Sequence, residues 1–193
     1  ADGLKHLSYG MVDLPTGKMK SREGTVVDAD ELMAEVIEEA RKGSVESGVI
    51  TDLSEAEQMA LNTQIGLAAL KYFILKVNPQ KRMLFDPKES VDLQGHTGPY
   101  IQNACVRARS ILRKADVQEI DYSGAIAYNH LETAEKDIIA QIARLPEIIQ
   151  TAAAAYDPSS SAAFCYEVAK SYHRLYHDYQ FLKAETQEAQ LFR

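Results

Sequence analysis

Three cations stand at alternate positions in a short segment between two glycines near the start of the chain. Lys18, Lys20 and Arg22 lie between Gly17 and Gly24, in the sequence Gly-Lys-Met-Lys-Ser-Arg-Glu-Gly. In an extended or looped backbone, side chains at alternate positions point to one side and could converge on one anion. A triphosphate is the anion that this cluster would suit. The alternative is a solvated hairpin turn, since both the P-loop and the dinucleotide-binding glycine patterns are absent from the sequence.

Residues 96–115 form the most basic stretch of the chain, with four basic residues and no acidic ones. The spacing of the apolar residues there predicts a helix whose packed face spans about 120° of arc, at about 100° per residue. The four cations fall outside that arc, so we expect a cationic face that contacts nucleic-acid phosphates. The alternative is an ordinary solvated helix surface. The cations are Arg107, Arg109, Arg113 and Lys114, and the apolar residues are Ile101, Ala104, Cys105, Ala108, Ile111, Leu112 and Ala115.

Two further groups of side chains have types and spacing that could bind a metal ion or nucleic-acid bases. His173 and His177 have the i, i+4 spacing of two metal ligands on a helix, but no third ligand is suitably placed in the sequence, so we predict no metal site. Five tyrosines could stack on unpaired bases. Of these, Tyr172, Tyr176 and Tyr179 share an apolar stripe and are expected to pack in a core. The five are Tyr156, Tyr166, Tyr172, Tyr176 and Tyr179.

The elements that would position these groups differ between the two halves of the chain. The first 27 residues contain short β-favouring pieces at 9–14 and 25–27, separated by glycines and a proline. Asp28 and Ser54 each precede a glutamate by three residues, which is the spacing of a capping box and predicts two helix starts. We expect the first helix to end at Gly43, and the second to end before Asn78 and the proline that follows it.

Residues 78–99 contain three prolines and two glycines, and are expected to be a loop at a domain boundary. Apolar stripes beyond this loop predict four helices with short connections, which favours antiparallel packing. The predicted fold class is therefore mainly α, with a short strand and loop segment at the N-terminus followed by an antiparallel helical bundle. The predicted helices cover 101–115, 131–145, 146–155 and 159–182, and the predicted domains are 1–95 and 96–193.

Composition excludes several classes of protein. The chain has 193 residues, of which 46% are apolar and 25% charged, as in ordinary globular proteins. A net charge of -7 excludes a general nucleic-acid coat and leaves only local basic patches. No apolar run approaches the roughly 18 to 20 residues of a membrane span, and the first residues lack the order of a signal peptide. We expect a cytoplasmic monomer without a membrane partner, in which Cys105 and Cys165 are reduced thiols.

The cationic loop and two later motifs together resemble one family. Residues 17–27 are similar to the KMSKS loop of class I aminoacyl-tRNA synthetases in its arginyl form, Gly-Lys-Met-Ser-Thr-Arg-Lys-Gly followed by a short apolar strand. Residues 96–107 resemble the arginyl-synthetase signature Thr-Gly-Pro-Tyr-x-Gln-Tyr-Ala-x-x-Arg, and residues 166–177 resemble a helix of the anticodon-binding domain. Because the three similarities occur in the family's order, the chain is identified as resembling arginyl-tRNA synthetase.

Some features depart from the family pattern. Ser21 occupies the place of the loop's second lysine, so Lys20 or Arg22 would have to meet the phosphate, and Asn103 replaces the usual tyrosine of the second motif. The HIGH motif, the arginine pocket and the last helix of the family have no counterpart in this sequence. The resemblance therefore implies a C-terminal fragment, with the end of a catalytic core followed by most of a DALR-type anticodon-binding domain.

The resemblance implies that the intact protein ligates arginine to tRNA(Arg), using ATP, with Mg²⁺ accompanying the ATP, to form arginyl-adenylate. Lys18 and Lys20 would be catalytic, because they would neutralise charge that develops on the β- and γ-phosphates. The fragment alone is expected to be inactive. The alternative is a non-catalytic helical module that binds tRNA or a protein, although such a module would not need the loop. The implied ATP-binding residues are Gly17, Lys18, Met19, Lys20, Ser21 and Arg22, and the implied tRNA-binding residues are Tyr100, Arg107, Arg109, Arg113 and Lys114.

Overall fold

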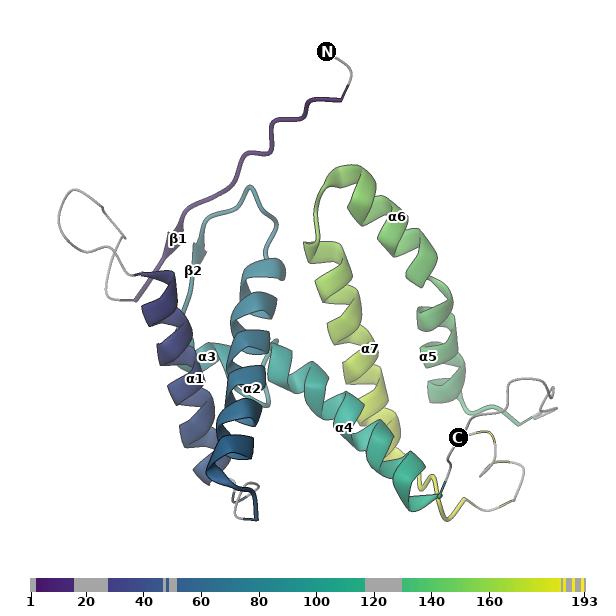
Figure 1. Cartoon of the computed structure of the whole chain (residues 1–193). Helices are drawn as coiled ribbons and strands as arrows, with labels where there is room; N and C mark the ends of the chain where they lie inside the picture. Colours follow the sequence, from purple (N-terminus) through teal and green to yellow (C-terminus); the bar gives the residue numbers. More distant parts are fainter. Residues whose placement is uncertain are drawn as a thin grey trace.

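Helices form almost all the regular structure of the described residues, as the sequence predicts. The computed structural model describes residues 3–15, 28–46, 48, 52–116, 130–184, 186, 189 and 192. In these parts it contains a two-stranded sheet and seven helices (Figure 1). The predicted mainly α fold class is confirmed. The predicted strand at 25–27 and the cationic loop at 17–24 lie outside the described residues.

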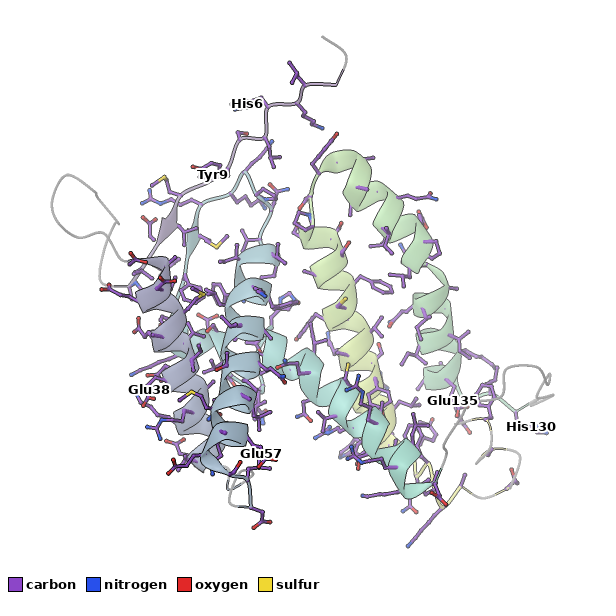
Figure 2. All side chains as sticks on the ribbon, viewed as in Figure 1. His6, Tyr9, Glu38, Glu57, His130 and Glu135 are labelled. Carbon is purple, nitrogen blue, oxygen red and sulfur yellow. The ribbon has the colours of Figure 1, made fainter. Side chains whose placement is uncertain are left out.

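The first part of the molecule is a helical hairpin whose starts are set by local capping. Helix α1 covers Ala29–Glu46 and begins where the Asp28 carboxylate accepts a hydrogen bond from the backbone N–H of residue 30 at 2.9 Å. Helix α2 covers Glu55–Leu75, and its predicted capping box is present between Ser54 and Glu57. Figure 2 shows Glu57 at the beginning of α2. The predicted end of the first helix at Gly43 is wrong, because α1 continues for three more residues and accommodates the glycine.

The hairpin packs on a small sheet that the sequence predicts only in part. Strand β1, Val12–Asp13, lies within the predicted β-favouring piece, and it pairs in parallel with β2, Met83–Leu84. The sequence predicts only a loop at residues 78–99, but they contain β2, the short helix α3 at Pro87–Ser90 and the first two residues of the next helix. The buried core of this part is formed by Leu14, Val36, Ala69, Leu70, Phe73 and Phe85.

The second part of the molecule is a bundle built on a central helix. Helix α4 covers Gly98–Lys114, α5 covers Thr133–Ala143, α6 covers Leu145–Ala155 and α7 covers Ser159–Asp178. Helices α5 and α6 follow one another as a bent arm, and α7 lies between this arm and α4 (Figure 1). The predicted helix start at Pro146 is confirmed, since this proline lies in the first turn of α6. Just before α7, the Asp157 carboxylate accepts a hydrogen bond from the Ser159 N–H at 2.9 Å.

The two parts contact one another through α2, which packs against α4 and α7. The Tyr72 hydroxyl on α2 donates a hydrogen bond to the Ala162 carbonyl of α7 at 3.0 Å. Gly98, which begins α4, lies so close to α2 that a Cβ atom there would be 2.6 Å from the Ala68 carbonyl oxygen. The domain division at residues 95 and 96 stays a prediction. In the part of the chain that the structure describes, no helix is long and apolar enough to cross a membrane.

Candidate nucleic-acid interface

The candidate ATP-binding residues cannot be placed, because the whole set from Gly17 to Arg22 lies outside the described residues. Their phosphate chemistry stays a prediction from the sequence. The tRNA-binding candidates all lie on α4, whose geometry the structure describes completely.

The start of α4 is fixed by its N-cap and by contact with α2. Thr97 is buried, and its hydroxyl oxygen accepts a hydrogen bond from the Tyr100 N–H at 3.3 Å. The same hydroxyl donates to the Asp92 carbonyl. The proline that follows Gly98 has no N–H, so it suits a first turn in which backbone donors have no helical partner. These contacts fix the position of Tyr100 in the first turn of α4, from which its side chain reaches α7.

Aromatic side chains fill the space between the beginning of α4 and the middle of α7. The ring of Tyr100 packs edge-on against His173, with a centroid distance of 4.6 Å, and lies 5.3 Å from the ring of Tyr166. His96 extends this cluster, with its ring centroid 3.9 Å from that of Tyr166 and 5.7 Å from that of Tyr72. Tyr166 was a predicted stacking candidate, whereas His96 and His173 had no predicted part in this cluster. Their partners come from distant helices, which sequence spacing does not indicate.

The side chain of Arg107 points into the contact between α4 and α7. Its Nη1 lies 3.0 Å from Nδ1 of His173, and its guanidinium lies 5.0 Å from the centre of the Tyr176 ring. Both distances are those of real contacts, a hydrogen bond in the first case and a cation–π contact in the second. Arg107 is half-buried as a result. The prediction that it lies away from the packed face of the helix is therefore wrong.

The four cations of α4 lie on two different sides of the helix. Residues seven apart on a helix differ by only about 20° around its axis, so Tyr100, Arg107 and Lys114 form one row. Because each residue of a helix turns about 100° around its axis, Arg109 and Arg113 lie roughly opposite that row. Arg109, Arg113 and Lys114 are exposed, and so are Cys105 and Leu112 of the predicted apolar arc. The row contacts α7 at its beginning and reaches solvent at its end.

Burial changes the ionisation of the groups around the row. Partial burial raises the pKa of the Tyr100 hydroxyl, so this group is a neutral hydrogen-bonding group at pH 7. Burial also lowers the pKa of His96, with a further contribution from the nearby Lys76 ammonium group. Lys76 donates to the His96 carbonyl at 3.0 Å, and burial lowers its pKa too. The Tyr100 and His96 rings are thus neutral at pH 7, and neutral rings near a guanidinium suit a nucleobase next to a phosphate.

His173 and His177 are not arranged as a pair of metal ligands. His173 contacts Arg107, a cation, and His177 contacts the Asp178 carboxylate at 2.9 Å. Within the described ranges, no group of three or more His, Cys, Asp or Glu side chains is arranged to hold a metal ion.

A second surface feature is the groove between α5 and α7, with a volume of about 580 Å³. Its charged lining is mixed, because Asp137 and Glu167 lie among the cations Arg144, Lys170 and Arg174. Lys170 is 3.7 Å from Glu167, so part of the positive charge is neutralised within the groove. We therefore assign the candidate interface to the row on α4.

Comparison with known proteins agrees with the domain that the sequence predicts. Residues 101–193 match the family described as the DALR anticodon binding domain. The chain is 47% identical over 192 residues to an arginine–tRNA ligase of Parabacteroides distasonis, and 49% identical over 193 residues to one of Flavobacterium psychrophilum. These alignments cover 99% and 100% of this chain. A solved structure of Thermus thermophilus arginyl-tRNA synthetase superposes with a TM-score of 0.81 at 26% identity, over 97% of this chain.

The alignments cover nearly all of this chain but only about a third of each relative. The chain spans 32% of the Parabacteroides protein, 31% of the Flavobacterium protein and 31% of the Thermus chain. About two thirds of each relative therefore has no counterpart in these 193 residues.

Proposed function

We propose that the chain binds tRNA(Arg) through α4, because residues 101–193 match the DALR anticodon binding domain and the chain is similar along its whole length to arginine–tRNA ligases. The observation that carries the proposal is the row formed by Tyr100, Arg107 and Lys114. It combines an aromatic ring, a guanidinium held against aromatic rings and an exposed ammonium group on one side of a helix. Unpaired bases stack on such rings, while the cations contact the phosphates between them.

We further propose that this chain is the C-terminal part of an arginine–tRNA ligase, and that the loop at residues 17–24 acts on ATP in the intact enzyme. The support is the similarity of this loop to a KMSKS loop, together with the relatives' names. Lys18 and Lys20 would bind the β- and γ-phosphates and stabilise their charge as pyrophosphate leaves. Mg²⁺ is expected to accompany the ATP. The adenylation chemistry and the transfer of arginine to tRNA would then belong to the intact enzyme, with this part contributing the loop and the tRNA contact.

Titration of the purified chain with tRNA(Arg) at several salt concentrations tests the α4 interface. The four variants Arg107→Ala, Arg109→Ala, Arg113→Ala and Lys114→Ala remove one cation each. Every lost phosphate contact should weaken binding, and should reduce the slope of log K against log salt by roughly 0.7 to 0.9. If the row carries the contact, Arg107→Ala and Lys114→Ala will show this change more strongly than the other two variants.

A matched control comes from α1, where Arg41 is an exposed cation paired with Glu38 at 2.7 Å. Figure 2 shows Glu38 on the outer side of α1, away from α4 and α7. Arg41→Ala changes the net charge by the same amount, so it should leave affinity and slope nearly unchanged. Equal losses for Arg41→Ala and all four α4 variants would indicate a general charge effect and contradict the proposed interface. Circular dichroism of each variant shows whether its fold is retained.

A further inference from the structure

The contact between Arg107 and His173 determines which ring nitrogen of the histidine carries a proton. A guanidinium only donates hydrogen bonds, so Nδ1 of His173, 3.0 Å from Arg107 Nη1, must be the acceptor. The other ring nitrogen, Nε2, lies 3.2 Å from the Tyr100 carbonyl oxygen, which only accepts. Both contacts are hydrogen bonds only when the proton is on Nε2. A proton on Nδ1 would place an N–H against the guanidinium.

The surroundings of the ring favour one fixed orientation. The His173 ring centroid is 4.6 Å from that of Tyr100 on α4 and 6.4 Å from that of Tyr172 on α7. The Tyr100 carbonyl holds one edge of the ring, and the guanidinium meets the opposite edge. The guanidinium of Arg107 also makes a cation–π contact with the ring of Tyr176. Arg107 is thus oriented from two directions, and its other N–H donors make no hydrogen bond to the described residues.

We propose that His173 is a positioning residue for tRNA binding: as the Nε2–H tautomer, it accepts one N–H of Arg107 and thereby directs the remaining donors of the guanidinium toward RNA. This inference rests on the proposed role of α4 in tRNA binding. A free arginine side chain has many rotamers, and fixing one of them before binding reduces the entropy lost in the complex. The chemistry that Arg107 meets is a phosphate or the acceptor edge of a base, both of which accept from a guanidinium.

The test combines spectroscopy with substitutions in the 193-residue chain. Long-range ¹H–¹⁵N correlation spectra of the parent should show His173 protonated on Nε2 and unprotonated on Nδ1. His173→Leu should weaken tRNA(Arg) binding about three- to tenfold, the effect of losing one hydrogen bond of ordinary net strength. His173→Asn keeps an acceptor near the position of Nδ1, and should restore affinity to within about twofold. In an Arg107→Ala background, His173→Leu should have almost no further effect.

A control and the contrary results separate this inference from the proposed function. His177→Leu, one turn further along α7, changes an exposed histidine that contacts only Asp178 among the described residues, and should not alter binding. If Arg107→Ala weakens binding but His173→Leu does not, the positioning role is wrong and the α4 interface stands. If Arg107→Ala has no effect, both the role of Arg107 and the positioning role are overturned. An Nδ1–H tautomer in the parent overturns the inference, even if His173→Leu fails to fold.

Discussion

At the residue scale, the two lysines of the loop should affect the rate of activation much more than the affinity for tRNA. In the full-length enzyme, Lys18→Ala and Lys20→Ala would each remove a charged hydrogen bond to a phosphate oxygen. Such a loss costs on the order of 3 kcal/mol in the transition state, or about a hundredfold in rate. The measurement is arginine-dependent ATP–pyrophosphate exchange in the presence of tRNA, beside a tRNA titration of the same variants.

Arg22→Ala is the comparison variant for the loop, because Ser21 occupies the family position of the second lysine. If Lys20 meets the phosphate, Arg22→Ala should reduce the rate less than Lys20→Ala does. Near-normal activation rates in both lysine variants would show that residues 17–24 are a surface turn, and would contradict their proposed catalytic role.

Single residues also show where the sequence stops being informative. The spacing of α4 correctly identified a helix and its cations, because helical period is a local property. It placed Arg107 away from the packed face, because Arg107 falls outside the arc of about 120° that the apolar residues of the helix occupy. The partners that hold it, His173 and Tyr176, are 66 and more residues away in the sequence. No pattern within α4 indicates that such partners exist.

At the scale of elements, the close approach of α1 and α2 depends on a glycine. A Cβ atom at Gly66 would lie 2.8 Å from the Ile37 Cα, which is closer than real Cβ atoms come to backbone. Gly66→Ala should therefore push the two helices apart, and we expect it to lower the free energy of unfolding by about 1 to 3 kcal/mol. Urea denaturation followed by circular dichroism measures this change.

Gly43 provides a matched control within the same hairpin. A Cβ atom there would meet nothing within 4 Å, and the position is helical. Gly43→Ala should stabilise α1 by about 0.5 to 1 kcal/mol, since alanine is the better helix former. The two substitutions are chemically identical and should change the unfolding midpoint in opposite directions. A midpoint for Gly66→Ala equal to or above that of the parent would contradict the observed packing of the hairpin.

The elements themselves were predictable where their signals are local. The capping box at Ser54 and the proline at position 146 predicted helix starts that the structure contains. The parallel pair of Val12–Asp13 with Met83–Leu84 was not predicted, because each strand has only two residues and the partners are about 70 residues apart. The end of α1 was also missed, since a glycine in open space does not stop a helix that is supported by packing.

At the scale of the whole molecule, we expect this chain alone to form no arginyl-tRNA. It corresponds to about a third of the relatives' length, and the resemblance places the HIGH motif and the arginine pocket in the remainder. Incubation with ATP, Mg²⁺, arginine and tRNA(Arg) should therefore yield neither pyrophosphate exchange nor charged tRNA. The full-length enzyme under the same conditions is the positive control. Activity of the purified chain above that of an enzyme-free blank would contradict this division of labour.

The central claim is that the chain contacts the anticodon region of tRNA(Arg) through α4, and comparing its affinities for two pieces of that tRNA tests it most directly. One piece is the anticodon stem-loop and the other is a minihelix containing the acceptor stem, each labelled and titrated at the same salt concentration. We predict that the stem-loop binds within about tenfold of the intact tRNA, because the row from Tyr100 to Lys114 would meet unpaired bases and their phosphates. We also predict that the minihelix binds much more weakly, and that Arg107→Ala weakens only the stem-loop complex. Equal affinities for the two pieces, with no selective effect of Arg107→Ala, would contradict the account.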